Sequence, residues 1–322
     1  MTIRLPKRTR AAVAIAVAGL TLAACGGNND STGTDGDSIS GPVVIDGSST
    51  VEPLSSAAAE LFMGQNPDTN VTVGTSGTGG GFEKFCAGET DISNASRPIK
   101  DSEIAICEQN NIAYSQLTVA NDALSVVVNN ENDWASCLTV EQLNSIWAPD
   151  STVNNWNQVD PSFPDEPLQL FGAGSDSGTF DYFTEAVNGE EGASRTDYNP
   201  TEDDNVTVQG VSATRGALGY FGYSYLEANA DKVKGVAIDG GEGCVAPSAE
   251  TAQDGTYQPL SRELFIYVSD AALQKPQAVA FADYYLENNT EIVEAAGFIP
   301  LTDEQVQVAQ DQLAELNTKA GN

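Results

Sequence analysis

Histidine is absent from this chain of 322 residues. Its absence excludes a Ser-His-Asp triad, a histidine general base and any zinc or iron site with histidine ligands. Basic residues are scarce, because 14 lysines and arginines stand against 46 aspartates and glutamates. The formal net charge of −32 argues against a nucleic-acid ligand and against electrostatic docking on an anionic membrane. Carboxylates, hydroxyl groups, backbone amides, a few arginines and five cysteines remain for function.

The hydrophobic run near the N-terminus is too short to cross a membrane. Residues 11–22 are small or apolar, whereas a spanning helix needs about 20 residues. Arg4, Lys7, Arg8 and Arg10 precede this run, so we interpret residues 1–24 as a secretory signal peptide. The sequence Leu-Ala-Ala-Cys that ends at Cys25 resembles a bacterial lipobox, which predicts lipidation of Cys25. The alternative is an ordinary signal peptide that happens to precede a cysteine.

The segment after Cys25 predicts a flexible tether. Residues 25–41 are rich in Gly, Asn, Asp, Ser and Thr, and they offer almost nothing to bury. A lipidated cysteine followed by such a linker predicts a folded part anchored on the outer face of the cytoplasmic membrane, either periplasmic or at the cell surface. The length that remains is enough for about two domains.

Four cysteines follow Cys25, and an even number in an exported chain indicates two disulfides. Three pairings exist. We favour Cys86–Cys107, which is local, with Cys137–Cys244, which would brace a later region. Metal binding is the alternative, but the cysteines show no C-x-x-C spacing and no histidine assists them.

Three turns rich in Gly, Ser and Thr lie between a short β-like run and a helix-like segment. The β-like runs are residues 43–45, 71–73 and 168–171, and the turns that follow are residues 46–50, 74–81 and 172–179. The simplest interpretation of each turn is that its hydroxyl side chains cap the helix that follows. Three such helix N-termini at one place would instead form an anion cradle from backbone N–H groups and hydroxyls.

The same glycines fit neither of two nucleotide-binding motifs. Gly74 and Gly79 have the glycine spacing of a P-loop, but Gly80 and Gly81 stand where Lys and Ser/Thr are required. The glycines at 77, 79, 80 and 81 do not fit the dinucleotide pattern either.

The chain after Cys25 has four arginines, whose fork of donors suits tetrahedral oxyanions. Arg97 follows Ser96 and precedes Pro98, which favours an extended, ligand-facing position. Arg195 is a second candidate for binding an anion, and a surface ion pair is the alternative role for it. We interpret Arg215 and Arg262 as surface ion pairs.

Four ordered motifs resemble the phosphate-binding lipoproteins of ABC-type phosphate uptake systems. They are residues 46–51 (DGSSTV), 75–81 (TSGTGGG), 95–98 (ASRP) and 176–181 (DSGTFD). Residues 217–223 (ALGYFGY) and 258–262 (QPLSR) extend the likeness over nearly the whole mature chain.

The resemblance implies an α/β fold, the two-lobed type II periplasmic-binding-protein fold, with the ligand in the cleft between the lobes. We expect lobe 1 to contain residues 42–120 and 259–322, and lobe 2 to contain residues 121–258. Two crossing segments near residues 118–128 and 257–268 would form the hinge. A capping box at Thr302 and Gln305 predicts a closing helix that packs on lobe 1.

The resemblance also implies a set of ligand-binding residues. Together with the arginine candidates, they are Ser49, Thr50, Val51, Gly77, Thr78, Ser96, Arg97, Ser177, Gly178, Thr179 and Arg195. Two positions depart from well-known members, because Ser96 stands where an aspartate accepts the phosphate proton and Ala173 stands where an arginine precedes the third turn. Asp204 is a candidate for the missing acceptor, so oxyanion binding is the firmer expectation and phosphate selectivity the weaker one.

The implied ligand is inorganic phosphate, and the implied protein partners are the permease subunits of an ABC transporter. We expect a monomer without cofactor, metal or enzymatic activity. Three alternatives stay open: a receptor for another small oxyanion, a phosphoester hydrolase that uses Asp176 and Ser177, and an adhesin that uses the aromatic residues at 220–225.

Overall fold

The structure is a computed structural model that describes residues 39–175 and 177–320. The predicted signal peptide, the lipidation site Cys25, nearly all of the predicted linker and Asp176 lie outside the described residues. Within the described ranges, no helix is long and apolar enough to cross a membrane.

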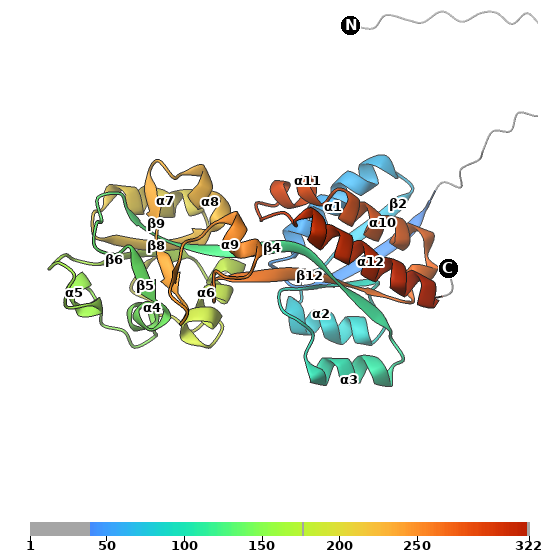
Figure 1. The fold of residues 1–322 in the computed structure, drawn as a ribbon. Helices are drawn as coiled ribbons and strands as arrows, with labels where there is room; N and C mark the ends of the chain where they lie inside the picture. The colour runs from blue at the N-terminus through green and yellow to red at the C-terminus, as the bar shows by residue number, and fades with distance from the viewer. Residues whose placement is uncertain (1–38, 176, 321–322) are drawn as a thin grey trace, which may run out of the picture. The chain divides into compact units, whose positions relative to one another are not determined.

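One continuous sheet runs through both lobes in the described part of the chain. Its strand order is β2, β1, β3, β12, β4, β8, β6 and β7, with β9 paired to β4. Strand β4 (Tyr114–Asn129) first pairs antiparallel with β12 (Ser261–Ser269), and from Leu124 onward it pairs with β8 and β9 instead. β4 therefore belongs to both lobes, and Figure 1 shows it passing between them beside β12. The two segments predicted to form the hinge overlap these two strands.

Lobe 1 is built on β1 (Gly41–Gly47), β2 (Thr69–Val73), β3 (Ile92–Ala95), β12 and the first half of β4. Its helical elements are α1 (Glu52–Gln65), α2 (Gly77–Cys86), α3 (Asp101–Gln109), the 3-10 turn η1 (Ala272–Gln274), α10 (Pro276–Glu287), α11 (Asn289–Ala295) and α12 (Asp303–Ala320). α1, α10, α11 and α12 share one buried core with the sheet, which includes Phe62, Phe281 and Leu313. α2 and α3 enclose a second core around Phe82 and Tyr267.

The closing helix forms as predicted. Thr302 and Gln305 exchange hydrogen bonds of 3.0 and 3.2 Å, which is the reciprocal capping box. Leu313 and Leu316, on the apolar face of α12, are buried in the lobe 1 core.

Lobe 2 contains the second half of β4, β6 (Gln169–Ala173), β7 (Asn199–Thr201), β8 (Ala217–Gly222) and β9 (Val233–Gly235). A smaller sheet joins β5 (Cys137–Thr139), β10 (Ala237–Asp239) and β11 (Cys244–Val245). The helices are α4 (Val140–Trp147), α5 (Trp156–Val159), α6 (Gly178–Asn188), α7 (Asp204–Ala213), α8 (Tyr223–Ala228) and α9 (Ala249–Gln253). Tyr220 and Phe221 are fully buried, and Tyr220 stacks on Phe183 at 3.8 Å, so these two aromatics serve the core.

Both predicted disulfides are confirmed. Cys86–Cys107 joins the end of α2 to α3, and Cys137–Cys244 joins β5 to β11.

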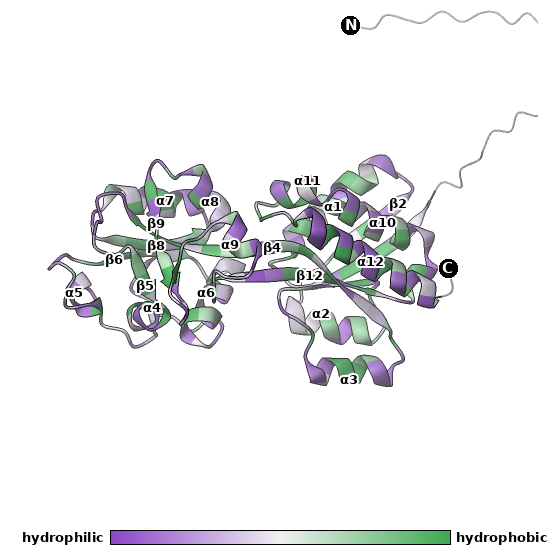
Figure 2. Ribbon diagram, in the orientation of Figure 1, coloured by the Kyte–Doolittle hydropathy of each residue, from purple (hydrophilic) through white to green (hydrophobic). Residues whose placement is uncertain are grey.

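The hydropathy of β12 changes along its length. Figure 2 shows the strand hydrophilic where it passes between the lobes and hydrophobic further along, in agreement with the sequence SRE followed by LFIYV. Ser261 is buried, Arg262 is partly buried and Glu263 is exposed, whereas the strand is buried from Leu264 onward, so the polar start of β12 is its less enclosed part.

Candidate functional site

The first turn lies between β1 and α1, and it is held by the backbone of β3. The Ser48 N–H donates to the carbonyl oxygen of Asn94 at 2.9 Å. Gly47 lies directly against the Asn94 backbone at a φ of 142°, so a side chain here would collide with β3. The N-cap of α1 is Val51, fully buried in the lobe 1 core, and no described side chain caps this helix. The alternative reading of this turn, a side-chain cap on its helix, therefore does not hold for α1, and Ser49 and Thr50 line the cavity described below.

The second turn lies between β2 and α2, and Asp46 shapes it. The carboxylate of Asp46 accepts hydrogen bonds from the N–H and hydroxyl of Ser76 at 3.0 and 2.5 Å, and from the Lys84 ammonium at 2.6 Å. Burial would raise the pKa of Asp46, but these hydrogen bonds outweigh it and lower the pKa. A side chain at Gly81 would lie 2.5 Å from Cα of Gly47, so α2 can pack this tightly on β1 only because Gly81 has none.

The third turn lies between β6 and α6. The Ser177 hydroxyl caps α6 by accepting from the Thr179 N–H at 3.2 Å. Gly178 directly faces the first turn, because a Cβ on Gly178 would lie 2.7 Å from Oγ1 of Thr50. The first turn of lobe 1 and the third turn in lobe 2 therefore meet at Thr50 and Gly178.

The end of β3 adds Ser96 and Arg97 beside the second turn. Oγ1 of Thr78 accepts from the Ser96 N–H at 3.2 Å and lies 3.1 Å from the Ser96 hydroxyl. The guanidinium of Arg97 forms a two-pronged ion pair with Glu103 at 2.8 and 2.9 Å. The hydrogen bond to Glu103 raises the pKa of Arg97. Burial would raise the pKa of Glu103, but the hydrogen bonds from Arg97 and from the Lys100 N–H lower it.

These turns surround a cavity of about 340 Å³, which we call the polar cavity. Seven of the predicted ligand-binding residues line it, together with the cationic residues Lys100 and Arg262 and the acids Asp181, Glu185 and Glu191. The seven are Ser49, Thr50, Gly77, Thr78, Ser96, Arg97 and Gly178. The cations belong to lobe 1 or to its strand β12, and the acids lie on α6 or just after it in lobe 2.

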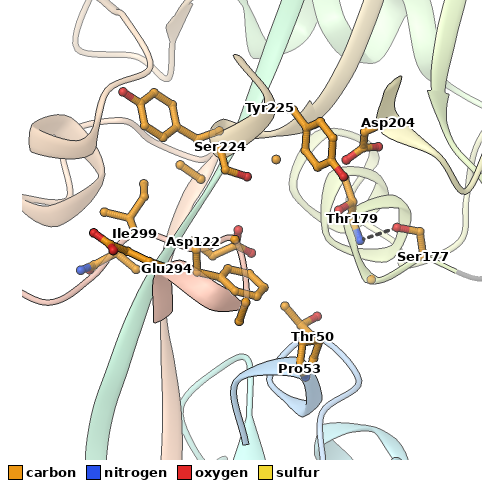
Figure 3. A pocket seen from close by; sticks show the side chains of 18 of the residues that line it. Thr50, Pro53, Asp122, Ser177, Thr179, Asp204, Ser224, Tyr225, Glu294 and Ile299 are labelled. Carbon is orange, nitrogen blue, oxygen red and sulfur yellow. Dashed lines mark hydrogen bonds between the residues drawn. The ribbon is translucent and has the colours of Figure 1, made fainter. Parts of the chain in front are cut away.

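A neighbouring cavity of about 420 Å³, the hinge cavity, shares Ser49, Thr50 and Gly178 with the polar cavity. Predicted residues Ser177 and Thr179 line it as well. Figure 3 shows Thr50 and Pro53 on one side of this cavity, with Ser177, Thr179 and Asp204 across from them. The two cavities thus meet where the first and third turns touch.

Asp204, the candidate acceptor of a ligand proton, lines the hinge cavity. Burial raises its pKa to about 6, with further contributions from the charges of Asp203 and Glu202. Ala173, at the end of β6, is buried, and its carbonyl oxygen accepts from the Tyr198 hydroxyl at 2.8 Å. No described group of three or more Cys, Asp or Glu side chains is arranged to hold a metal ion.

The structure corrects the expected role of Arg195. Its guanidinium is buried in lobe 2, where it donates to the carbonyl oxygens of Ile146 and Val153 at 2.9 and 2.8 Å and to the carboxylate of Asp197 at 2.6 Å. Among the described residues that line the two cavities, Arg195 is absent. This arginine ties α4 to the loop that follows it.

Arg262 lines the polar cavity, although the sequence did not single it out as a candidate. It was expected in a surface ion pair, but its side chain is only 16% exposed, it pairs with the buried Asp122, and it lines the polar cavity. Its position in the hydrophilic start of a crossing strand was the available signal.

A family model described as a PBP superfamily domain matches residues 31–289 of this chain. The protein SphX of Synechocystis sp. is 48% identical over 265 residues, which are 81% of this chain and 79% of SphX. The phosphate-binding protein PstS of Staphylococcus saprophyticus is 38% identical over 301 residues, which are 93% of this chain and 92% of that protein.

A solved structure is also similar to this chain. The crystal structure of a possible phosphate binding protein from Planctomyces limnophilus has a TM-score of 0.83 and 48% sequence identity. The similarity covers 87% of this chain and 99% of that one.

Proposed function

Because this chain belongs to the phosphate-binding family of the PBP superfamily, we propose that it binds inorganic phosphate in the cleft between its lobes and delivers it to an ABC permease. Its fold is the predicted two-lobed, type II periplasmic-binding-protein fold. The protein makes and breaks no bond in its ligand. Binding favours the closed arrangement of the lobes, which removes water from the anion and strengthens its hydrogen bonds.

One observation carries this proposal: three separate β–α turns and the end of β3 converge on one small polar cavity. The proposed ligand-binding residues are Ser49, Thr50, Val51 through its backbone, Gly77, Thr78, Ser96, Arg97, Ser177, Gly178 and Thr179. Their hydroxyls and N–H groups are donors suited to the oxygens of a tetrahedral anion. In two of the three turns no side chain caps the helix that follows, so helix capping does not account for their hydroxyl residues.

The strongly acidic surface does not prevent anion binding at this place. Salt screens long-range repulsion within about 10 Å, so the local groups decide the affinity. The N-termini of α1, α2 and α6 supply partial positive charge, and Arg97, Lys100 and Arg262 supply full charge at the wall of the polar cavity.

We propose Asp204 as the carboxylate that accepts a hydrogen bond from the proton of the bound phosphate. A carboxylate accepts a hydrogen bond from HPO₄²⁻ and repels sulfate, which has no proton to donate at neutral pH. Asp204 lies with Thr179 at the hinge cavity, next to the third turn. Titration of Asp204→Asn with both anions tests the assignment: the ratio of phosphate to sulfate affinity should fall, and an unchanged ratio would reject Asp204.

The setting outside the cytoplasm is also proposed. Lipidation of Cys25 and the tether 25–41 would hold a monomeric receptor at the outer face of the cytoplasmic membrane. Cell fractionation after Cys25→Ala should move the protein from the membrane fraction to the soluble exported fraction. Retention at the membrane would contradict the anchor without affecting the phosphate site.

Isothermal titration of the chain from residue 25 onward tests the main proposal. We expect one phosphate per chain with a dissociation constant in the micromolar range or tighter, roughly −8 kcal/mol. Sulfate and arsenate titrations identify a different oxyanion receptor if phosphate fails. Incubation with a phosphomonoester and metal supplements should release no phosphate, and release that depends on Ser177 would favour the hydrolase.

A further inference from the structure

Arg262 contacts elements of both lobes at the cleft. It lies at the start of β12, and its Nε donates to Oδ2 of Asp122 on β4 at 3.2 Å. Its Nη2 lies 3.4 Å from Oγ1 of Thr50 in the first turn, and its guanidinium packs over the ring of Tyr182 on α6 at 3.7 Å. One side chain therefore contacts both crossing strands, the first turn of lobe 1 and a helix of lobe 2.

The anchoring of this guanidinium leaves one edge unused. A guanidinium has five N–H donors in a fixed plane. Nε donates to Asp122, and the ring of Tyr182 covers one face of the guanidinium. Nη2 lies 3.4 Å from Oγ1 of Thr50, which is a long and therefore weak hydrogen bond. Nη1 has no hydrogen-bond partner among the described residues, although the side chain is largely buried. Nη1 is not among the buried side-chain atoms that lack a hydrogen-bond partner, so this edge is open to the polar cavity and free to donate to an acceptor there.

The other cations at the polar cavity are less well placed to pair with an anion. Arg97 already gives Nη1 and Nη2 to Glu103, and Nη1 also bonds to the carbonyl oxygen of Pro98. Lys100 is exposed to solvent. Asp122, in contrast, is only 6% exposed and holds Arg262 in place from the opposite crossing strand.

We propose that Arg262 binds the oxyanion through its Nη edge and that Asp122 positions it for this contact. The inference rests on the proposed oxyanion-binding function and assigns a residue within that site. Because Arg262 contacts both lobes, an anion held at its Nη edge also favours the closed arrangement.

Phosphate titrations of Arg262→Gln and Arg262→Lys test this inference. Loss of a charge-assisted pair should weaken binding by about 10- to 100-fold in Arg262→Gln. Arg262→Lys keeps the charge but loses the planar fork, so its affinity should lie between those of Arg262→Gln and wild type. Arg215→Gln is the matched control, because Arg215 is exposed in an ion pair with Glu166 and should not affect phosphate affinity.

Thermal unfolding with and without phosphate separates a binding role of Arg262 from a structural one. If Arg262 serves the ligand, the phosphate-induced rise in Tm should shrink in both Arg262 variants, even where the ligand-free Tm stays close to that of wild type. Asp122→Asn provides a further variant, in which the guanidinium remains but its charged anchor becomes a neutral amide, and phosphate affinity should fall here too.

The outcomes distinguish the inference from the proposed function. If wild type and Arg215→Gln both fail to bind phosphate, the proposed function fails. If wild type binds and both Arg262 variants bind equally well, the phosphate site stands and the assignment of Arg262 is wrong.

Discussion

Gly178 sets how closely the first and third turns approach each other. A Cβ at this position would lie 2.7 Å from Oγ1 of Thr50, at the contact between the lobes. Gly178→Ala should therefore hold the turns apart and weaken phosphate binding by about 5- to 150-fold, as expected for overpacking of 1–3 kcal/mol. Isothermal titration measures the effect.

Gly64→Ala is the control for this substitution. Gly64 lies in α1 with open space around its Cβ position, so alanine should leave phosphate affinity unchanged and stabilise the helix by about 0.5–1 kcal/mol. Equal affinities for wild type and Gly178→Ala would show that the two turns do not close on the ligand.

Asp204 predicts a pH dependence of stability. Its pKa of about 6 lies above that of an unfolded aspartate, so the folded state binds more protons between about pH 4 and pH 6. Stability therefore falls as the pH rises through this window. Asp204→Asn should remove this contribution and raise the free energy of unfolding at pH 7 by roughly 1–3 kcal/mol.

Urea unfolding at several pH values between about 4 and 7 measures this effect. Asp133→Asn is the control, because Asp133 is exposed and should leave the pH profile unchanged. A profile of Asp204→Asn that parallels wild type would contradict the elevated pKa.

At the scale of elements, Cys137–Cys244 closes a long loop within lobe 2, with a sequence separation of 107 residues. Replacing both cysteines by alanine should lower the free energy of unfolding by about 2–5 kcal/mol. Phosphate affinity should remain within about twofold of wild type, because neither cysteine lines the two cavities at the cleft. Denaturant unfolding and titration of the same sample give both values, and a loss of affinity in a folded variant would contradict this separation.

The β–α turns were predictable because each is encoded locally. Short runs that are mostly apolar, glycines and hydroxyl residues follow one another within about ten residues, and β1–α1, β2–α2 and β6–α6 form at these places. The side-chain roles of the hydroxyls were less predictable. The Ser76 hydroxyl of the second turn donates to the carboxylate of Asp46, which is distant in sequence. Among the described hydroxyl residues of the three turns, only Ser177 caps the helix that follows it.

The roles of the arginines depended on contacts that the sequence does not encode locally. Arg262 and Asp122 become neighbours through the antiparallel register of β12 and β4, where they are directly paired. Arg195 finds its partners in the carbonyl groups of Ile146 and Val153, which compete with any ligand. The family resemblance implied roles for the three turns and for Arg97, but it did not indicate that Arg262 lines the same cavity.

At the scale of the whole molecule, the excess of negative charge on the chain repels the proposed anionic ligand. The chain has a formal net charge of −32, and Glu185 lines the polar cavity and acts on the charge of Arg97. Glu185→Gln should strengthen phosphate binding by about 1.4- to fivefold at low salt, because one exposed charge contributes roughly 0.2–1 kcal/mol. The gain should shrink at high salt.

Titrations at two ionic strengths measure this gain. Glu190→Gln removes an exposed charge just beyond α6 that does not line the polar cavity, so it should have a smaller effect. An equal gain from both variants would indicate that only net charge matters.

A crystal structure of the phosphate complex tests the convergence of the turns most directly. We predict one phosphate whose oxygens accept hydrogen bonds from all three β–α turns, from both lobes of the same chain. An anion bound by a single turn, or bound away from Thr50, Thr78 and Gly178, would contradict the account.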